Sequence, residues 1–378
     1  MIHLRAYAKI NPFLEITGKR DDGYHELSLI FRPVSIYDEL FVEKVPGFGK
    51  LSLSCSDETL EGKDNIIFKA YEVMKERFRR IPSLRVRLIK NIPQGAGMGG
   101  GSSDAAAFLK AVCRLTGLDL SSEEMFDIGA LIGADVPACM LKTPSYSQGA
   151  GDEPAAIPAG EKRYYIGIKP AVSFNTAKMY GEYDRKYLYS KRRLKSAKSM
   201  ISAINCADPS KEAKCFYNIF EKTVPERKLI ADIKKQLVSV GAIGALMTGS
   251  GSAVMGIFAD KAGRNRAFKA LCKKELPFDT EKIFTCESVC DKKQKDYFVY
   301  IFECADKTLY TGYTTNLDKR EAAHNGGISG AKYTKSRGGG RIVYSECYDT
   351  KNDALRREYK IKQMSRKDKI LLVNENIM

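Results

Sequence analysis

The sequence lacks the long apolar runs and the export signal that would place a chain in or across a membrane. No window approaches the roughly 18 consecutive apolar residues of a membrane-spanning helix. The first ten residues, MIHLRAYAKI, lack the apolar core of a signal peptide. We therefore expect neither a membrane span nor export, and we expect a cytoplasmic protein.

Metal-binding side chains are also scarce. The chain has three histidines, and its ten cysteines include no CxxC pair. Structural zinc sites and disulfide frameworks both depend on clustered or regularly spaced ligands of these types. Neither kind of site is predicted, and we expect reduced, mostly buried thiols.

Basic residues exceed acidic ones, which raises the question of a nucleic-acid partner. The formal net charge is +16, and lysine and arginine gain affinity for nucleic acid by displacing counterions from its phosphates. The excess is not gathered in a tail, because residues 296–378 hold 15 Lys plus Arg against 11 Asp plus Glu. Part of it lies in residues 185–198, interpreted as a solvated face near anionic substrates.

The length and composition along the chain indicate several domains. A chain of 378 residues exceeds what one hydrophobic core usually serves. A stretch rich in Gly, Ser, Pro and Ala around residue 150 and a charged stretch, CDKKQK, mark two changes in the pattern. We predict domains at 1–150, 151–289 and 296–378, with 290–295 as a linker.

The most informative segment is PQGAGMGGGSSDAAA, residues 93–107. Apolar alternation over residues 84–88 predicts a strand before it, and we expect a helix over 105–115 after it. Glycines let backbone N–H groups converge, and a helix N-terminus adds partial positive charge. The pattern predicts a triphosphate site, in which the hydroxyls of Ser102 and Ser103 contact phosphate or Mg²⁺.

Other glycine-rich nucleotide sites fit this loop less well. Gly95, Gly97 and Gly100 satisfy GxGxxG, but the match lies some ninety residues into the chain and Asp119 sits in a turn instead of at a strand end. The GK[ST] of a Walker A loop is missing, as are the HRD and DFG motifs of protein kinases. A glycine-rich turn without a ligand remains the plain structural alternative.

The loop resembles the signature of the GHMP kinases, with Met98 where leucine is usual. Residues 8–27, AKINPFLEITGKRDDGYHEL, resemble the opening of the 4-diphosphocytidyl-2-C-methyl-D-erythritol kinases within that family. GADVP (133–137) and MTGSGSAV (247–254) resemble their later motifs, so the resemblance spans about 285 residues. It implies an α+β fold of two domains: a ribosomal-protein-S5-like N-terminal domain that binds ATP, and a ferredoxin-like C-terminal domain.

The resemblance also implies a reaction, the ATP-dependent phosphorylation of the 2-hydroxyl of 4-diphosphocytidyl-2-C-methyl-D-erythritol in the non-mevalonate isoprenoid (terpenoid) pathway, with Mg²⁺. Ser121 and Glu124 form a capping box that predicts a helix ending at Gly133, which exposes Asp135 as the candidate base. Lys9 would favour the deprotonated hydroxyl and hold Asp135 ionised. The residues alone favour plainer roles, with Asp135 as a turn residue and Lys9 as an edge-strand gatekeeper.

Further site residues follow from the same resemblance. The implied substrate-binding residues are Asn11, Tyr24, His25, Thr176, Gly249 and Ser250. The implied ATP-binding residues are Pro93, Gly95, Ala96, Gly97, Met98, Gly99, Gly100, Gly101, Ser102 and Ser103. Tyr24 is suited to stacking on the cytosine ring and His25 to reading its edge. The open alternatives are that Tyr24 and His25 pack a turn and that Gly249 and Ser250 form a tight turn between strands.

The last 80 or so residues need a separate explanation. Residues 297–325, YFVYIFECADKTLYTGYTTNLDKREAAHN, resemble the opening of the GIY-YIG nuclease domain, a small α/β fold. GAKYT (330–334) and ALRREYKIK (354–362) resemble segments of its small single-domain members. The alternation over 298–302 and a turn at 305–306 predict a hairpin that returns through Tyr310.

Candidate nuclease residues are Tyr300, Tyr310, Gly312, Arg320, His324 and Glu358. By resemblance, a tyrosine activates water, Arg320 stabilises the phosphate, and Glu358 holds Mg²⁺ or Mn²⁺ while DNA is cleaved. Arg320 and His324 share a helical face. Glu358 lies on an otherwise apolar face, which is costly without a partner and so favours a metal ligand. The tyrosines are otherwise core aromatics, and Arg320 and His324 a solvated pair.

We therefore predict a fusion of a small-molecule kinase with a metal-dependent DNA endonuclease. Two alternatives stay open. The C-terminal module is instead a non-catalytic adaptor that binds nucleic acid, or the kinase acts on another small alcohol of the mevalonate type.

Overall fold

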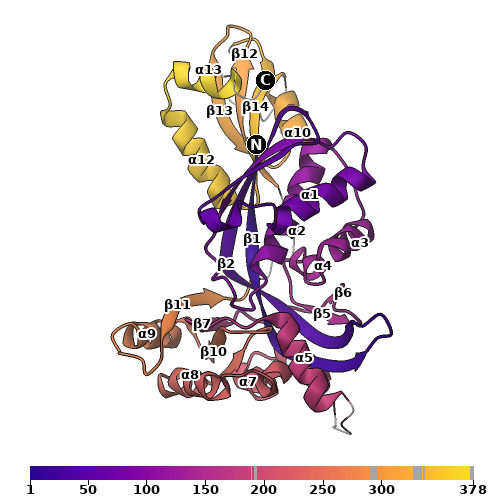
Figure 1. Ribbon diagram of the computed structural model, residues 1–378. Coiled ribbons are helices and arrows are strands. Elements are labelled where there is room, and N and C mark those ends of the chain that lie inside the picture. Colours follow the sequence, from indigo (N-terminus) through magenta and orange to yellow (C-terminus); the bar gives the residue numbers. More distant parts are fainter. Residues whose placement is uncertain (189, 191–193, 290–295, 327–333, 335–336, 375–378) are drawn as a thin grey trace.

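The computed structural model describes residues 1–188, 190, 194–289, 296–326, 334 and 337–374. Figure 1 shows three parts stacked along one axis, with the C-terminal strands and helices at the top, the N-terminal strands and α1–α4 in the middle, and α7–α9 with their strands at the bottom. We call residues 1–289 the kinase module and residues 296–374 the C-terminal module. Within the described part of the chain, no helix combines the length and apolar character needed to cross a bilayer.

The described strands are β1 (Ile2–Lys19), β2 (His25–Phe48), β3 (Leu51–Cys55), β4 (Pro82–Ile89), β5 (Ser145–Gln148), β6 (Glu153–Ala156), β7 (Tyr164–Pro170), β8 (Tyr217–Asn218), β9 (Gly244–Met247), β10 (Val254–Phe258), β11 (Thr280–Glu287), β12 (Tyr297–Cys304), β13 (Leu309–Thr314) and β14 (Gly340–Tyr348).

The described helices are α1 (Ile66–Arg77), α2 (Gly100–Thr116), α3 (Ser122–Ile132), α4 (Val136–Cys139), α5 (Thr176–Tyr187), α6 (Lys198–Ile204), α7 (Pro209–Cys215), α8 (Arg227–Ser239), α9 (Lys261–Leu271), α10 (Leu317–His324), α12 (Lys351–Gln363) and α13 (Arg366–Asn374), with the 3-10 turns η1 (Glu58–Leu60) and η2 (Ile219–Lys222).

Two long strands form the spine of the molecule. β1 and β2 pair antiparallel from Ile2 opposite Val42 to Lys19 opposite His25. The larger described sheet runs in the order β13-β12-β14-β1-β2-β4-β3, with β5 pairing with β2, β6 with β5, and β8 with β1. Helices α1, α2 and α3 cover one face of its kinase part and bury an apolar cluster that includes Phe108. Because β1 is so long, one strand reaches from the C-terminal module to the lower part of the molecule (Figure 1).

The lower part is built on a smaller antiparallel sheet in the order β11-β7-β10-β9. Its core gathers apolar residues of β7, α8, β10 and α9 with side chains from β1 and β2. β6 belongs to the large sheet and β7, the next strand along the chain, opens the small sheet, although β8 and β12–β14 later return to the large sheet. The division of the chain into domains stays a prediction, and the predicted linker 290–295 lies outside the described residues.

Local structure agrees with the capping signals and differs at one helix start. Ser121 forms the expected capping box with Glu124, and α3 ends at Gly133. The helix predicted over 105–115 instead begins at Gly100. Its first bond runs from the Ser103 N–H to the Gly99 carbonyl, 2.9 Å away. Gly99 has a left-handed φ of 68°, so the loop turns directly into the helix without the extra residues that the prediction allowed.

Candidate active site

A cavity of about 1150 Å³ opens beside the glycine loop. Its walls come from segments far apart in the chain: β1, the turn between β1 and β2, the segment before α1, the glycine loop, the start of α4, α5, and the loop after β9. Nearly all the kinase site residues predicted from the sequence line it: Lys9, Asn11, Tyr24, His25, Pro93, Gly95, Ala96, Gly97, Met98, Gly99, Gly100, Gly101, Ser102, Asp135, Thr176, Gly249 and Ser250.

The glycine loop requires its glycines because two backbone segments meet there. Gly97 has a φ of 71°, and a Cβ on it would lie 2.2 Å from the Thr248 carbonyl oxygen and 2.8 Å from the Gly251 nitrogen. The two loops are joined by a hydrogen bond of 3.0 Å from the Ser252 N–H to the Gly95 carbonyl. The glycine loop and the loop after β9 therefore pack as one unit at the N-terminus of α2. Convergent N–H groups at this position favour an anion.

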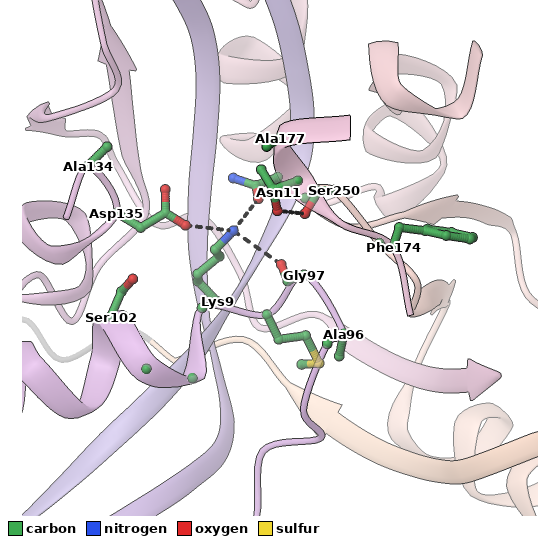
Figure 2. A pocket seen from close by; sticks show the side chains of 18 of the residues that line it. Lys9, Asn11, Ala96, Gly97, Ser102, Ala134, Asp135, Phe174, Ala177 and Ser250 are labelled. Atoms are coloured by element: carbon green, nitrogen blue, oxygen red, sulfur yellow. Dashed lines mark hydrogen bonds and ion pairs between the residues drawn. The ribbon is translucent and has the colours of Figure 1, made fainter. Parts of the chain in front are cut away.

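Lys9 and Asp135 meet at the centre of the cavity (Figure 2). The Lys9 Nζ lies 3.1 Å from Asp135 Oδ2. It also donates to Asn11 Oδ1 at 2.7 Å and to the Gly97 carbonyl at 3.2 Å. Lys9 is only 7% exposed, and a buried ammonium needs such partners. These contacts fix its charge at one point between Asp135 and the glycine loop.

The local sequence explains why these two side chains point inward. Lys9 stands in β1 next to the register shift between Tyr7 and Lys9, where the regular pairing with β2 is interrupted. Asp135 is the N-cap residue of the short helix α4, but its side chain makes no capping hydrogen bond. Its carboxylate is about one third exposed. Asp135 is thus a carboxylate held by one cation and open to a ligand.

The far end of the cavity gathers aromatic and charged side chains. His25 Nε2 lies 2.6 Å from Asp184 Oδ1, and Lys19 Nζ lies 2.5 Å from Asp184 Oδ2. Partial burial opposes the negative charge of Asp184, but these hydrogen bonds hold the pKa of its carboxyl below the ordinary value. The His25 ring stacks on Tyr180, with centroids 4.5 Å apart. Tyr24 is 68% exposed at the adjoining turn, which leaves its ring face free to receive a planar ligand.

Thr176 and Ser250 close the cavity between these two ends. Their hydroxyl oxygens are 2.8 Å apart. Thr176 begins α5, which also carries Tyr180, and Ser250 lies in the loop after β9. This contact therefore joins the glycine-loop end of the cavity to its aromatic end. Asn11 is fixed by donating its Nδ2 to the Ile30 carbonyl and its N–H to the Thr248 hydroxyl.

Ser103 is the predicted kinase residue that the structure does not bring to the cavity. Its hydroxyl donates to the Tyr7 carbonyl at 2.7 Å and its side chain is buried. The reason is helical geometry, since α2 already includes both serines and adjacent helical positions point in different directions. Ser102 lines the cavity and Ser103 anchors the helix to β1.

The sequence interpretation missed several lining residues. Asn65 caps α1, and Tyr180 and Asp184 stand four apart on α5. Lys90 and Asp104 form a buried pair at 2.7 Å beneath the glycine loop. Burial raises the pKa of Asp104 to about 8, and its Oδ1 is buried without a hydrogen-bond partner. The spacing of Tyr180 and Asp184 was a usable signal, because residues four apart share a helical face.

A second cluster lies in the C-terminal module. The Arg320 Nε donates to the Tyr300 hydroxyl oxygen at 2.9 Å, and that hydroxyl lies 2.8 Å from His324 Nε2. His324 Nδ1 is 2.7 Å from the Thr334 hydroxyl. Burial, helped by the charge of Arg320, lowers the pKa of His324 to about 4. His324 is therefore neutral near pH 7, and its Nε2 shares a hydrogen bond with the Tyr300 hydroxyl.

The remaining predicted residues of this module surround Tyr300. Burial raises the pKa of Tyr300 to about 12. A Cβ on Gly312 would lie 2.6 Å from the Tyr300 hydroxyl oxygen, so this glycine permits the close approach. The Tyr310 ring is 5.3 Å from that of His324. Of the segment GAKYT, residues 330–333 lie outside the described residues.

Glu358 differs from the sequence expectation in one respect. The sequence favours a metal as the partner of its carboxylate, and the structure places its Oε1 2.9 Å from Lys362 Nζ, one helical turn on. Its side chain is only 14% exposed. The lysine partner follows from the helix itself, because positions four apart are neighbours. A cation at this carboxylate therefore has to compete with Lys362.

Family models match three segments of the chain. Residues 65–143 match the GHMP kinases N terminal domain, and residues 211–276 match the GHMP kinases C terminal domain. Residues 296–370 match the GIY-YIG catalytic domain.

Individual proteins resemble the kinase module. A 4-diphosphocytidyl-2-C-methyl-D-erythritol kinase of Acetivibrio thermocellus is 34% identical over 276 residues, which cover 72% of this chain and 96% of that protein. One from Caldicellulosiruptor saccharolyticus is 36% identical over 259 residues, 68% of this chain and 88% of that protein. A crystal structure of 4-(cytidine 5'-diphospho)-2C-methyl-D-erythritol kinase matches with a TM-score of 0.63 and 26% identity, covering 76% of this chain and 100% of that one.

Proposed function

Because the chain belongs to the 4-diphosphocytidyl-2-C-methyl-D-erythritol kinase family, we propose that it transfers a phosphoryl group from ATP to the 2-hydroxyl of 4-diphosphocytidyl-2-C-methyl-D-erythritol. Family membership makes it a small-molecule kinase that uses ATP. The observation that carries the finer proposal is the contact of 3.1 Å between Lys9 and Asp135. It lies between a phosphate-binding loop and an aromatic recess within one cavity.

The proposed division of labour follows the cavity from end to end. Backbone N–H groups of the glycine loop and the N-terminus of α2 bind the triphosphate. Asp135 accepts the proton of the substrate hydroxyl, since its carboxylate is partly exposed and makes no capping bond. Lys9 offsets negative charge between the hydroxyl and the phosphoryl group. Such positioning and charge stabilisation supply most of the catalysis in phosphoryl transfer.

The residues present also fit a magnesium ion that arrives with ATP. Mg²⁺ is usually held by one or two carboxylates together with substrate phosphates. Two carboxylates, Asp104 and Asp135, border the cavity on either side of the glycine loop, and Ser102 adds a hydroxyl. The Oδ1 of Asp104 has no hydrogen-bond partner, and a bound cation would favour the ionised form of this carboxyl, whose pKa burial raises to about 8. When bound, the ion would neutralise charge on the phosphates.

The aromatic end of the cavity suits the cytidine part of the proposed substrate. The exposed Tyr24 ring offers a stacking surface. Asp184 fixes the Nε2 of His25 through a hydrogen bond, which leaves Nδ1 to read a base edge. A phosphorylated product of this kind would place the enzyme in the non-mevalonate route to isoprenoid precursors.

A panel of alcohols tests the kinase proposal. Purified full chain with Mg-ATP is expected to produce ADP and a new phosphomonoester from 4-diphosphocytidyl-2-C-methyl-D-erythritol. Mevalonate and homoserine should be turned over at least about 10⁴-fold less efficiently, because polar groups built to bind the base stay unpaired without it. Coupled ADP release and phosphorus NMR measure both. Comparable turnover of mevalonate would point to the other alcohol class and contradict the proposal.

For the C-terminal module we propose a metal-dependent DNA endonuclease. The chain of contacts from Arg320 through Tyr300 to His324 supports it. The hydrogen bond from Arg320 favours the ionised form of Tyr300, which would let the phenolic oxygen activate water. Arg320 offers a charge for the scissile phosphate, and Glu358 a carboxylate for Mg²⁺ or Mn²⁺. A module that only binds nucleic acid would not need a buried tyrosine connected in this way.

Replacement of Glu358 by glutamine tests the nuclease proposal. Full chain is expected to nick supercoiled DNA with Mg²⁺ or Mn²⁺. Glu358→Gln should lower the rate by more than about 100-fold, since the loss of even an outer partner of a metal costs 10–100-fold. Glu303→Gln is the matched control, because Glu303 pairs with Lys307 on the same module. DNA binding without nicking in the wild type would favour the adaptor alternative.

A further inference from the structure

The two modules of this chain share one sheet. β14 pairs in parallel with β1, with Ile2 opposite Cys347 and His3 opposite Tyr348. The Cys347 N–H bonds to the Met1 carbonyl at 3.4 Å. β8 pairs with β1 farther along, at Phe13 and Leu14, but without β14 the start of β1 would be an edge of the kinase sheet. Open edges are sites of unwanted pairing that proteins usually cover. The C-terminal module covers this one (Figure 1).

Apolar side chains continue across the junction. Cys347 is buried within the same apolar cluster as the kinase residues of β1 and α2, and Phe298 packs against that cluster. The His3 ring lies 4.2 Å from Phe41 of the kinase module and 5.2 Å from Tyr348 of the C-terminal module. A core that runs through both modules is typical of a lasting interface rather than a passing contact.

Charges at the junction are segregated by module. The kinase side presents Arg5, Lys110, Arg114 and Lys142, and the C-terminal side presents Asp296, Asp349 and Asp353. Arg5 Nη2 lies 2.8 Å from Asp353 Oδ1, and Arg114 Nη2 lies 2.5 Å from Asp296 Oδ1. The basic face of the kinase module therefore meets an acidic face of the C-terminal module. Such charge complementarity fixes which surfaces associate and in which orientation.

Asp349 is the centre of this charge cluster. Its Oδ2 accepts the Arg5 N–H at 3.2 Å and lies 3.4 Å from Lys142 Nζ, and its Oδ1 lies 3.5 Å from Arg114 Nη2. Burial opposes its ionisation, yet Lys142, Arg114 and Lys110 hold the pKa of its carboxyl below the ordinary value. Arg5 and Arg114 also pair with Asp353 and Asp296, so removing this buried anion would chiefly deprive Lys142 of its ion pair at 3.4 Å.

A kinase relative without this module is found among the similar proteins. The match to the Acetivibrio thermocellus protein takes up 96% of that protein, which leaves no room for a module of the size of residues 296–370. In this chain, the basic patch around Arg114 contacts acidic residues of the fused C-terminal module.

We propose that the C-terminal module is a docked structural subunit of the kinase module, held by β14 on the edge of β1 and by Asp349 in the pocket of Arg5, Arg114 and Lys142. The two modules form one rigid unit through this interface and not merely through the peptide that connects them. This role is independent of whether the C-terminal module cleaves DNA.

The proposal is tested by cutting the connection in the folded full chain. Residues 290–295 are replaced by a protease recognition sequence, and the purified protein is cleaved without denaturant. The two fragments are expected to co-elute in size exclusion at low salt and to separate as NaCl rises, because the interface includes ion pairs. Fragments that separate at low salt would overturn the docked interface.

Two variants of the cleavable chain then assign the contact. Asp349→Asn is expected to weaken association of the cut fragments on the order of 100-fold, as expected for loss of one partner of a buried pair. Asp318→Asn, an exposed acid on α10, makes the same charge change away from the interface and should leave association unchanged. If Asp349→Asn does not fold, Arg114→Gln removes the Arg114–Asp349 ion pair from the kinase side and should weaken association in the same way. Equal association of Asp349→Asn and Asp318→Asn would overturn the role of Asp349.

Discussion

Replacement of Asp135 by asparagine is expected to lower the kcat of phosphoryl transfer by about 10²- to 10⁴-fold, the range that a positioned general base contributes. Asparagine keeps the size of the side chain but cannot take the hydroxyl proton. Because the Asp135 side chain makes no capping hydrogen bond in α4, the helix start should survive the change. KM for ATP should change little, since the glycine loop is untouched. Steady-state kinetics with Mg-ATP and the proposed substrate measure both constants.

Asp127→Asn is the matched control for this prediction. Asp127 is an exposed aspartate on the neighbouring helix α3, so its amide variant carries the same charge change without touching the cavity. Its kcat should equal that of the unmodified chain, and thermal unfolding should show both variants folded. An Asp135→Asn variant that keeps kcat within a few-fold of the control would show that Asp135 is not the base.

Replacement of Gly97 by alanine is expected to abolish nucleotide binding and to destabilise the kinase module by at least about 3 kcal/mol. Its φ of 71° already costs a non-glycine residue about 1–2 kcal/mol. The added Cβ would also stand 2.2 Å from the Thr248 carbonyl oxygen, so the two loops must separate. Thermal unfolding measures the loss. ATP at 100 times its Kd should stabilise the unmodified chain by about 2.7 kcal/mol and leave the variant unaffected.

Gly117→Ala separates the cost of the left-handed φ from the cost of the Cβ clash. Gly117 has a φ of 72°, close to that of Gly97, but nothing lies within 4 Å of the position of its Cβ. The control should therefore lose only the φ cost of about 1–2 kcal/mol and keep its stabilisation by ATP. If Gly97→Ala behaved like Gly117→Ala, the contact between the two loops would not matter for nucleotide binding.

Local chemistry made much of the kinase module predictable. The GHMP fold expected from the glycine loop is confirmed by matches on both of its halves, and the capping box of Ser121 is confirmed in place. Such signals lie within a few residues of one another and act through φ, hydrogen bonds and side-chain spacing, so the sequence contains them completely. The hairpin of β12 and β13 was found for the same reason; it returns through Tyr310 as expected, and the structure places Tyr310 opposite Phe302.

Contacts between distant segments were only partly predictable. The motifs suggested that Lys9 and Asp135 act together, but the ammonium partners Asn11 and Gly97 depend on how β1 crosses the glycine loop. Tyr180 and Asp184 reach the cavity because α5 packs beside the turn between β1 and β2. Burial and packing direction set such contacts, and neither is written into a short window of sequence.

The sequence by itself determined the family, the phosphate-binding loop and the residues on which the chemistry is proposed to rest. Glycine φ angles, helix caps and motif order are local properties of the chain. Only the tertiary structure decided that Ser102 faces the cavity while Ser103 anchors α2, because a helix points neighbouring side chains in different directions. Only the tertiary structure joined β14 to β1 and placed Asp349 among cations of the kinase module. Strand pairing and buried charge pairs form between surfaces distant in sequence, where the complementarity of whole faces decides the outcome.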